Sequence, residues 1–385
     1  MHLISRPALT VGIEEEYLLV DRATRNLVND PSPELWTAAE EALGQRAMPE
    51  FLRAQMEVAT GVHDTIKAAG EELTSMRRTL NEVLNPHGAA IMAASTHPFA
   101  LWWEQQPTDR DRYKIMAEDL GMVARRMVIC GMHVHAGIED PDLRIDLMNQ
   151  VRYFLPHLLA LSTSSPFWGS RKTGLKSYRI STFRTMPRTG LPEEFASWSE
   201  YQRHVDVLVR AGIIEDSSKI WWDVRPSARF PTLEMRITDV CTRVEDTLTV
   251  AAVYLSMLHM LYRLRRNNQR WRQYAPMLIS ENIWRAQRYG VEGSLMDYGQ
   301  GVLVPFKDLV EEMIEMLRPD AEDLGCLEAV EHARTIVEAG TSADRQMQVY
   351  EAEVARGADH EEALRTVVDR LIEDTQPEGQ IAERG

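Results

Sequence analysis

The sequence predicts an α+β protein in which one sheet is packed under helices on one face and open on the other. Three observations support this fold class. Four separated stretches alternate apolar and polar residues with the period of two typical of a half-buried strand. Helical stretches lie between and after them, and the polar face of each strand carries groups suited to a metal ion or an anion. The four strands are residues 10–21, 50–60, 128–137 and 231–240.

Two of the expected helices begin at a capping residue. Ser32 followed by Pro33 fits the start of a helix through residue 43, and Asp64 is the expected N-cap of an amphipathic helix through residue 84. Pro156 predicts a kink in a helix over residues 140–161. Further helices are expected at 109–127, at 193–210 and, with breaks near 289–304 and at 340, over most of the chain after 243. Short extended segments are expected at 89–95 and 221–226.

The helical and strand periods are both absent from residues 162–192, a stretch rich in Gly, Ser, Thr and Pro. All of its charged side chains are basic, although the protein carries a formal net charge of −15. Such a segment is expected to be either a mobile lid that binds an anion or a solvated loop. Its basic residues are Arg171, Lys172, Lys176, Arg179, Arg184 and Arg188.

Composition places the chain among ordinary soluble globular proteins, with 44% hydrophobic and 26% charged residues in 385. The acidic net charge argues against nucleic acid or an anionic membrane as the partner. Three widely spaced cysteines indicate no disulfide framework. The longest apolar stretch, near residues 250–262, is shorter than the roughly 20 residues that span a bilayer. We therefore expect a cytoplasmic enzyme with small-molecule substrates, one catalytic domain over residues 1–375, and a disordered polar tail at 376–385.

The polar strand faces combine carboxylates, imidazoles and arginines. Each face alone would fit a solvated surface, and two histidines on a strand can simply be satisfied by nearby polar groups. Solvated faces favour Lys, Thr and Ser, however, whereas these collect Glu and His. Carboxylates that face one another repel unless protons or cations neutralise them. The set is Glu14, Glu16, Arg53, Gln55, Glu57, His133, His135, Glu234 and Arg236.

This combination favours Mg²⁺ or Mn²⁺ over structural zinc, because the polar residues of these strands include no cysteine ligand. Mg²⁺ bound by a few carboxylates completes its shell with water and substrate phosphates, and arginines would bind the same phosphates or a substrate carboxylate. The sequence contains neither a Walker-type G-x-x-x-x-G-K-[ST] run nor G-x-G-x-x-G. The pattern therefore indicates phosphoryl transfer rather than metal-dependent hydrolysis.

Three motifs carry a family resemblance, and they are residues 12–17 (GIEEEY), 131–135 (GMHVH) and 233–236 (LEMR). In this order they resemble the carboxylate–amine ligases of the glutamate–cysteine ligase type 2 family, which belong with glutamine synthetase. The resemblance extends from about residue 9 to about residue 350. It implies a curved, mainly antiparallel sheet whose concave face binds ATP and two or three divalent ions, with helices packed on the outer face.

The resemblance also implies roles for individual residues. It assigns Glu14, Glu16, Glu57, His133 and Glu234 to the metal ions, with Glu57 as an additional carboxylate of the active site. It places His135 beside the nucleotide and substrate. Arg236 matches the phosphate-directed arginine, and Arg225 is a second candidate for the transferring phosphoryl group. Arg179, Arg184 and Arg188 are the expected contacts to ATP or substrate.

The implied reaction is the phosphorylation of a substrate carboxylate by ATP, followed by attack of an amine on the acyl phosphate. In the type reaction these are the γ-carboxylate of L-glutamate and the α-amino group of L-cysteine, which yield γ-glutamylcysteine, ADP and phosphate. No motif describes the amine pocket, so another carboxylate–amine pair remains open.

Three other functions are compatible with parts of the pattern. A guanidino kinase would share the fold but keep the phosphoryl group on its product. An amidohydrolase also uses H-x-H on a strand, but its further metal ligands are expected on later strands, whereas His157, His204, His259 and His332 fall in helical stretches. A non-catalytic binding protein would have lost some of the motif residues. The helical stretches 309–317 and 343–372 are candidates for homo-oligomer formation.

Overall fold

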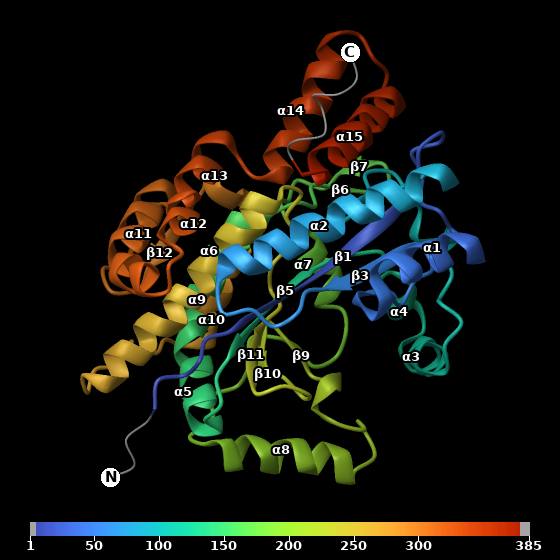
Figure 1. Ribbon diagram of the computed structural model, residues 1–385. Coiled ribbons are helices and arrows are strands. Elements are labelled where there is room, and N and C mark those ends of the chain that lie inside the picture. Colours follow the sequence, from blue (N-terminus) through green and yellow to red (C-terminus); the bar gives the residue numbers. More distant parts are fainter. Residues whose placement is uncertain (1–4, 378–385) are drawn as a thin grey trace.

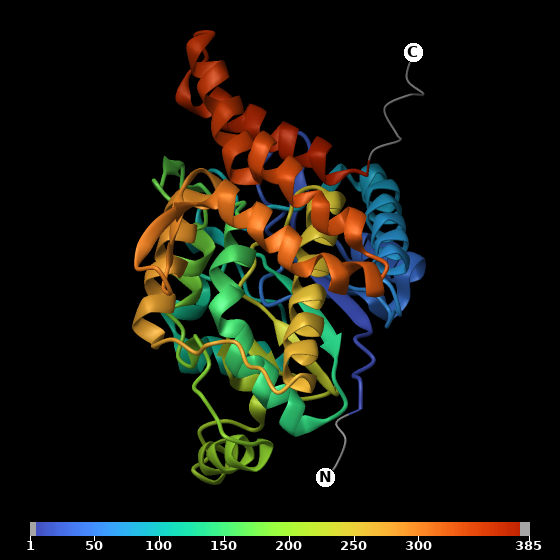
Figure 2. The ribbon, with the colours of Figure 1, turned by 90° about the vertical axis from the view of Figure 1, so that its left-hand side faces the viewer.

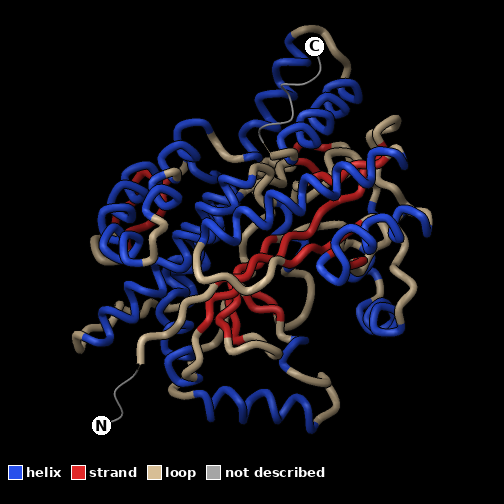
Figure 3. The backbone as a smooth tube through the Cα atoms, viewed as in Figure 1, coloured by secondary structure: helices blue, strands red, loops and turns tan. Residues whose placement is uncertain are grey.

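The computed structural model describes residues 5–377, and a seven-stranded antiparallel sheet with two open edges lies at its centre (Figures 1 and 3). The strand order is β10-β11-β5-β1-β3-β2, and β4 also pairs with β1. The expected α+β class with a mainly antiparallel sheet is therefore confirmed. The seven strands are β1 (Val11–Asp21), β2 (Ala47–Pro49), β3 (Gln55–Ala59), β4 (Ala89–Met92), β5 (Met132–Gly137), β10 (Val224–Pro226) and β11 (Thr232–Met235).

Strand β1 organises the sheet because it pairs with three others. Glu14 lies opposite Ala59 of β3 on one edge and His133 of β5 on the other. Beyond the end of β5, the same edge of β1 pairs with β4. Three two-stranded pairs lie outside this sheet: β6 (Phe167–Trp168) with β7 (Arg171–Lys172), β8 (Thr189–Gly190) with β9 (Trp221–Trp222), and β12 (Ser294–Asp297) with β13 (Val302–Pro305).

Helices α2 (Ile66–Leu84) and α9 (Val244–Arg266) cover the apolar face of the sheet, and α2 crosses β1 in Figure 1. Helices α14 (Ser342–Ala355) and α15 (His360–Thr375) stand together at one end of the molecule, and α8 (Trp198–Arg210) lies at the other (Figures 1 and 2). The other helices are α1 (Pro33–Leu43), α3 (Asp111–Leu120), α4 (Met122–Arg125), α5 (Pro141–Val151), α6 (Leu155–Ser162), α7 (Tyr178–Phe183), α10 (Pro276–Tyr289), α11 (Phe306–Asp323), α12 (Leu327–Glu331) and α13 (Ala333–Ala339).

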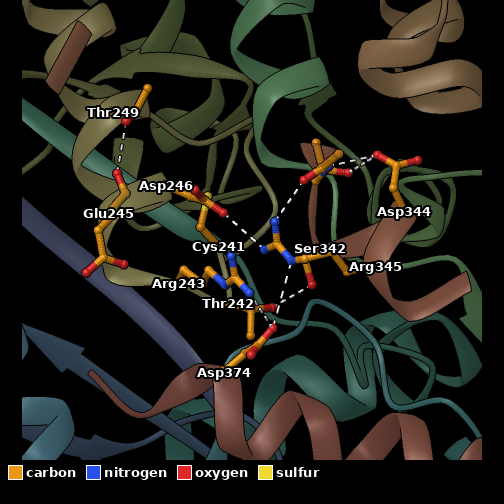
Figure 4. Close-up of polar contacts among 12 residues, drawn as sticks. Cys241, Thr242, Arg243, Glu245, Asp246, Thr249, Ser342, Asp344, Arg345 and Asp374 are labelled. Atoms are coloured by element: carbon orange, nitrogen blue, oxygen red, sulfur yellow. Dashed lines mark hydrogen bonds and ion pairs between the residues drawn. The ribbon is translucent and has the colours of Figure 1, made fainter. Parts of the chain in front are cut away.

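Polar contacts attach the two C-terminal helices to the segment that leads from the sheet into α9 (Figure 4). Arg345 of α14 donates to Asp246 of α9 over 3.1 Å. The hydroxyl oxygens of Thr242 and Ser342 lie 2.6 Å apart. Arg243 pairs with Asp374 of α15 over 3.4 Å. These contacts hold α14 and α15 against the start of α9. The tail predicted at 376–385 falls outside the described residues except for its first two.

Helix α9 is longer than the apolar stretch identified in the sequence. Among the described residues it is the one helix whose length and composition would allow it to cross a membrane. However, 83% of its most apolar window is buried inside the protein, as in the core helix of a soluble protein.

Several predicted element boundaries are wrong, each for a local reason. Thr65 rather than Asp64 caps α2, because the Thr65 side chain accepts the Ala68 N–H. The helix expected over 109–127 is divided at Gly121, whose φ of +55° breaks the helical path. The helix expected over 140–161 is interrupted by a 3₁₀ turn, and Pro156 lies in the first turn of α6 rather than at a kink. The helix expected from 193 begins only after the Ser197 cap.

The second predicted strand is also shorter than expected. Residues 50–54 form a turn closed by the bond from Gln55 N to Leu52 O, and β3 begins at Gln55. Arg53 therefore does not share the polar face of β3. It donates instead to Asp30 Oδ1 over 2.6 Å and to the Pro107 carbonyl over 3.3 Å.

Glu15 lies on the apolar face of β1 and is stabilised there by Arg77 of α2. Both side chains are fully buried, and Arg77 makes two bonds to the carboxylate at 2.7 and 2.9 Å. Thr247 of α9 donates a third bond to Glu15 over 2.7 Å. This ion pair joins β1, α2 and α9 through the core.

Replacing Arg77 by Met is expected to lower the free energy of unfolding by about 3–5 kcal/mol, because Glu15 would remain buried and charged without its partner. Urea unfolding monitored by circular dichroism measures this loss. The double replacement Glu15→Leu/Arg77→Met should recover part of it, since no unpaired charge remains. Arg78→Met is the matched exposed control on the same helix, and an equal loss in that variant would contradict the prediction.

His97 is expected to make the protein less stable in mild acid. Burial lowers its pKa to about 4, and its Nδ1 accepts the N–H groups of Phe99 and Ala100 over 3.2 and 2.9 Å. In the unfolded chain a histidine titrates near 6.5. Between pH 6.5 and 4 the unfolded state therefore binds a proton that the native state does not, so stability falls as the pH falls, by about 3 kcal/mol in total.

Unfolding measured from pH 7 to pH 4 tests this expectation. His97→Asn can still accept a backbone N–H but does not titrate, so its stability should fall less steeply over this range. His204→Asn changes an exposed histidine and should leave the slope unchanged. Identical slopes for wild type and His97→Asn would contradict the assignment.

Candidate active site

The antiparallel register aligns polar residues of five strands in rows across one face of the sheet. Because side chains alternate along a strand, residues two apart lie on the same face and meet their partners on the neighbouring strand. Residues that are up to 119 positions apart in the chain thereby become neighbours. The facing pairs are Glu14 with His133, Glu16 with Glu57, Glu234 with His135, and Glu234 with Arg225.

The first candidate metal group consists of Glu14, His135 and Glu234, which offer ligand atoms within 4.8 Å of one another. Glu14 Oε1 lies 3.3 Å from His135 Nε2. The other ring nitrogen of His135, Nδ1, is held by Thr232 Oγ1 at 2.9 Å, which orients the ring. His135 Nε2 is buried and has no well-directed hydrogen bond within the described part of the chain. An ion between these three residues would satisfy it.

His133 completes the surroundings of Glu14 but lies outside this group of three. Its Nδ1 is 3.1 Å from Glu14 Oε2 and 3.3 Å from Arg236 Nη1. The structure therefore groups His135, rather than His133, with the two carboxylates. Both histidines nevertheless share the face that alternation predicts.

The charges around the first group favour ionised carboxylates. Burial alone would raise the pKa of Glu14, but the adjacent side chains of His133 and His135 outweigh it and hold the pKa well below its usual value. Burial also opposes ionisation of Glu234, but Arg236 and Arg225 lower its pKa. The pKa of His133 falls to about 4 through burial and the charge of Arg236, so this ring is neutral at pH 7. The two carboxylates of the first group could therefore act as ligands. Burial opposes protonation of His135, but Glu14 and Glu234 outweigh it and raise its pKa, so a bound ion would compete with a proton for this ring.

The second candidate metal group consists of Glu16, Glu50 and Glu57, again with oxygen atoms within 4.8 Å. Burial and the like charges of Glu14, Glu50 and Glu16 raise the pKa of Glu57 well above its usual value. Burial also raises the pKa of Glu16, although the N–H of Gly131 donates to it over 2.6 Å. Buried carboxylates that repel one another in this way require a proton or a cation. A set of oxygen donors suits Mg²⁺ or Mn²⁺, so the residues fit such an ion.

Glu50 is a member of the second group that strand alternation did not reveal. In one continuous strand, Glu50 and Glu57 would point to opposite faces because they are seven residues apart. The turn over residues 50–54 removes this restriction and brings Glu50 beside Glu57. The signals in the sequence were Pro49 and the apolar pair Phe51-Leu52, both of which interrupt the alternation.

A cavity of about 130 Å³ adjoins the second group and contains two arginines. Arg236 donates to Glu234, and its buried Nε has no hydrogen-bond partner among residues 5–377. Arg179 is buried and donates to the carbonyls of Ile237 and Arg236, both over 3.1 Å. The cavity is lined by Glu16, Glu50, Phe51, Gln55, Tyr113, Met127, Ile129, His133, Arg179, Phe183, Met186, Trp221 and Arg236.

Gly131 allows Arg179 to reach this position. A Cβ atom at residue 131 would lie 2.4 Å from Arg179 Nη2, so any other residue here would displace the Arg179 guanidinium. The same glycine donates its N–H to Glu16. The glycine that opens the GMHVH motif thus supports both a carboxylate and an arginine of the site.

The segment 162–192 is packed on the protein where it carries Arg179, in contrast to the predicted lid or solvated loop. Buried Asp239 accepts hydrogen bonds from Ser164 N, Ser165 Oγ and Ser177 Oγ at 2.7–2.9 Å. Ser165 Oγ in turn accepts the N–H of Arg179 over 3.1 Å. Asp239 was not recognised in the sequence, because no local pattern relates it to three serines that lie 62–75 residues earlier.

Three of the predicted arginines lie beside the cavity rather than in its wall. Arg184 donates to buried Asp223 over 3.0 Å. Arg188 donates to the Lys219 carbonyl over 2.8 Å and covers the ring of Trp221, which does line the cavity. Arg225 binds both oxygens of Glu234 at 3.0 and 3.2 Å and also donates to the carbonyls of Ser218 and Ile220. Every guanidinium nitrogen of Arg225 is thus used to orient protein groups.

The chain is similar to known proteins in sequence and in fold. A family model described as glutamate–cysteine ligase family 2 matches residues 10–370. A protein of Rhodospirillum rubrum, provisionally named glutamate–cysteine ligase 2, is 60% identical over 96% of each chain. Proteins of the same provisional name from Jannaschia sp. (52% identity, 95% of this chain and 96% of the relative) and Ruegeria pomeroyi (50% identity, 96% of each chain) are also similar.

Two solved structures share the fold at low sequence identity. The glutamate–cysteine ligase of Francisella tularensis in complex with AMP has a TM-score of 0.67 at 16% identity and is matched over 97% of this chain and 90% of its own. A bifunctional glutathione synthetase from Pasteurella multocida has a TM-score of 0.68 at 15% identity, over 95% of this chain and 52% of its own.

Proposed function

The chain belongs to glutamate–cysteine ligase family 2, and we propose that it is a cytoplasmic ligase that joins a carboxylate to an amine with conversion of ATP to ADP and phosphate. The observation that carries this proposal is that two groups of carboxylates lie at one face of the sheet, beside a cavity lined by two arginines. The AMP complex of the Francisella tularensis neighbour supports an adenine nucleotide as a substrate. L-Glutamate and L-cysteine are the proposed substrates.

In the proposed reaction, a carboxylate oxygen of the first substrate attacks the γ-phosphorus of ATP, and ADP leaves. The amine nitrogen then attacks the carbonyl carbon of the acyl phosphate, and phosphate and a proton are released as the amide forms. No covalent enzyme nucleophile is required. Catalysis therefore depends on positioning and on neutralisation of the phosphate charge.

We assign the protein groups to these tasks as follows. Glu14, His135 and Glu234 would hold one divalent ion, and Glu16, Glu50 and Glu57 a second. Such ions, when bound, neutralise phosphate oxygens and hold them in line for transfer. Arg236 and Arg179 supply positive charge inside the cavity, where a phosphoryl group or a substrate carboxylate would lie. Arg225 acts as a positioning residue because it fixes both oxygens of Glu234.

The rival functions are less well supported. The remaining described histidines stand apart from the two groups: His157 lies in an aromatic cluster and His259 pairs with Asp320. An amidohydrolase-type set of ligands is therefore not assembled on this sheet. A guanidino kinase would use the same ions and arginines, and only the reaction products distinguish it.

A product screen tests the proposal. Purified protein with ATP, Mg²⁺ and L-glutamate is offered L-cysteine and a panel of other amines, and phosphate release and product mass are measured. A ligase releases one phosphate for each amide formed, whereas a kinase leaves the phosphoryl group on its product. Absence of phosphate release with every amine, or release that persists unchanged in Glu14→Gln, would contradict the proposal.

A further inference from the structure

The outer face of helix α10 is exposed and carries a large apolar side chain between two opposite charges. Met277 and Trp284 are 76% and 48% exposed, although both are large hydrophobic residues. Glu281 and Arg288 are exposed on the same face, because the spacing of four, three and four residues keeps all four side chains within one narrow stripe. Neither Glu281 nor Arg288 forms an ion pair with any residue that the structure describes.

The order of these side chains makes the stripe self-complementary. Glu281 precedes Trp284 by three residues, and Arg288 follows it by four. When two such helices pack antiparallel, residues at equal distances on opposite sides of the centre face each other. With the centre between Trp284 and Arg285, Glu281 and Arg288 lie at equal distances on opposite sides, so Glu281 of each helix faces Arg288 of the other. A helix with the same sequence in the antiparallel direction thus matches this stripe in charge as well as in apolarity.

Apolar surface continues beside α10 on the β12–β13 hairpin. The hairpin is fixed to the helix, since Asn282 exchanges hydrogen bonds with Met296 and Arg285 donates to the Ser294 carbonyl. Val302 and Leu303 of β13 are 49% and 53% exposed. The C-terminal helix α15 exposes less apolar surface, because its apolar residues are already buried within the chain.

We propose that a second copy of the chain packs on this surface, with the two α10 helices antiparallel around a twofold axis near Trp284. Two Glu281–Arg288 pairs then flank a central pair of Trp284 rings, and the β12–β13 hairpins extend the contact. The surface lies on helix α10 and its hairpin, and none of its residues belongs to the two carboxylate groups or lines their cavity. The inference therefore does not depend on the proposed reaction.

Charge reversal provides the test. Light scattering and sedimentation over a range of protein concentrations should give wild-type protein twice the 44.0 kDa mass of one chain. Glu281→Arg and Arg288→Glu each create two like-charged contacts across the axis, so each should raise the dimer dissociation constant by about tenfold or more. The double variant Glu281→Arg/Arg288→Glu restores opposite charges and should dimerise like wild type.

Matched changes elsewhere separate this surface from general effects. Trp284→Ser should weaken the dimer, whereas Trp103→Ser, which alters a tryptophan that is 61% exposed outside this surface, should not. Circular dichroism confirms that each variant is folded. A wild type that stays monomeric at all concentrations would overturn the proposal, as would a dimer that is unaffected by either charge reversal or one that the double variant fails to restore.

Discussion

Replacing Glu14 by Gln is expected to lower kcat by about 10²- to 10³-fold while the fold persists, an effect comparable to the loss of a principal charge-stabilising group. Glu14 contacts both His133 and His135 and belongs to the first candidate metal group. Gln keeps the shape but removes the negative charge, and its amide nitrogen cannot act as a ligand. Divalent ions should therefore bind more weakly to the variant.

Two measurements check this expectation. Phosphate release at saturating substrate reports kcat, and titration with Mn²⁺ followed by electron paramagnetic resonance reports ion binding. Glu41→Gln, an exposed change on α1, is the control and should leave both unchanged. Retention of kcat within tenfold together with undiminished Mn²⁺ binding would show that Glu14 is not a metal ligand.

Replacing Arg236 by Met should also lower kcat by about 10²- to 10³-fold, because the variant loses the positive charge that we propose faces the transferring phosphoryl group. Glu234 would still be bound by Arg225, so its carboxylate should keep its position. Arg236→Lys keeps the charge but lacks the planar guanidinium, and it should recover only part of the activity.

Steady-state kinetics separate this role from a purely structural one. A loss of transition-state stabilisation lowers kcat and kcat/KM together, whereas a loss of ground-state binding raises KM alone. Arg203→Met, an exposed change on α8, serves as the control. Unchanged kcat in Arg236→Met would remove Arg236 from the phosphoryl-transfer step.

Strand alternation predicted much of the site correctly. It placed Glu14 with Glu16 and His133 with His135 on shared faces, and the register confirms that these faces adjoin. It also placed Glu234 with Arg236, which the structure brings into contact. These predictions succeed because the face of a side chain depends only on its own strand.

Alternation failed where the chain leaves the regular strand. The turn at residues 50–54 directed Arg53 away from the site and brought Glu50 into it. Similarly, the stretch around Arg179 reads as an irregular basic loop, yet the serines bound to Asp239 hold it against the sheet. Neither result is visible in local periodicity, because each depends on a partner elsewhere in the chain.

The amino-acid sequence by itself determined the strands, the faces of their side chains and the kinds of group that the site contains, since these follow from local backbone geometry and residue chemistry. Only the tertiary structure decided which strands are neighbours, which carboxylates lie close enough to hold an ion together and which arginines line the cavity. It also revealed that Arg77 neutralises Glu15 in the core. These outcomes depend on long-range pairing, where burial makes an unpaired charge so unfavourable that distant residues must meet.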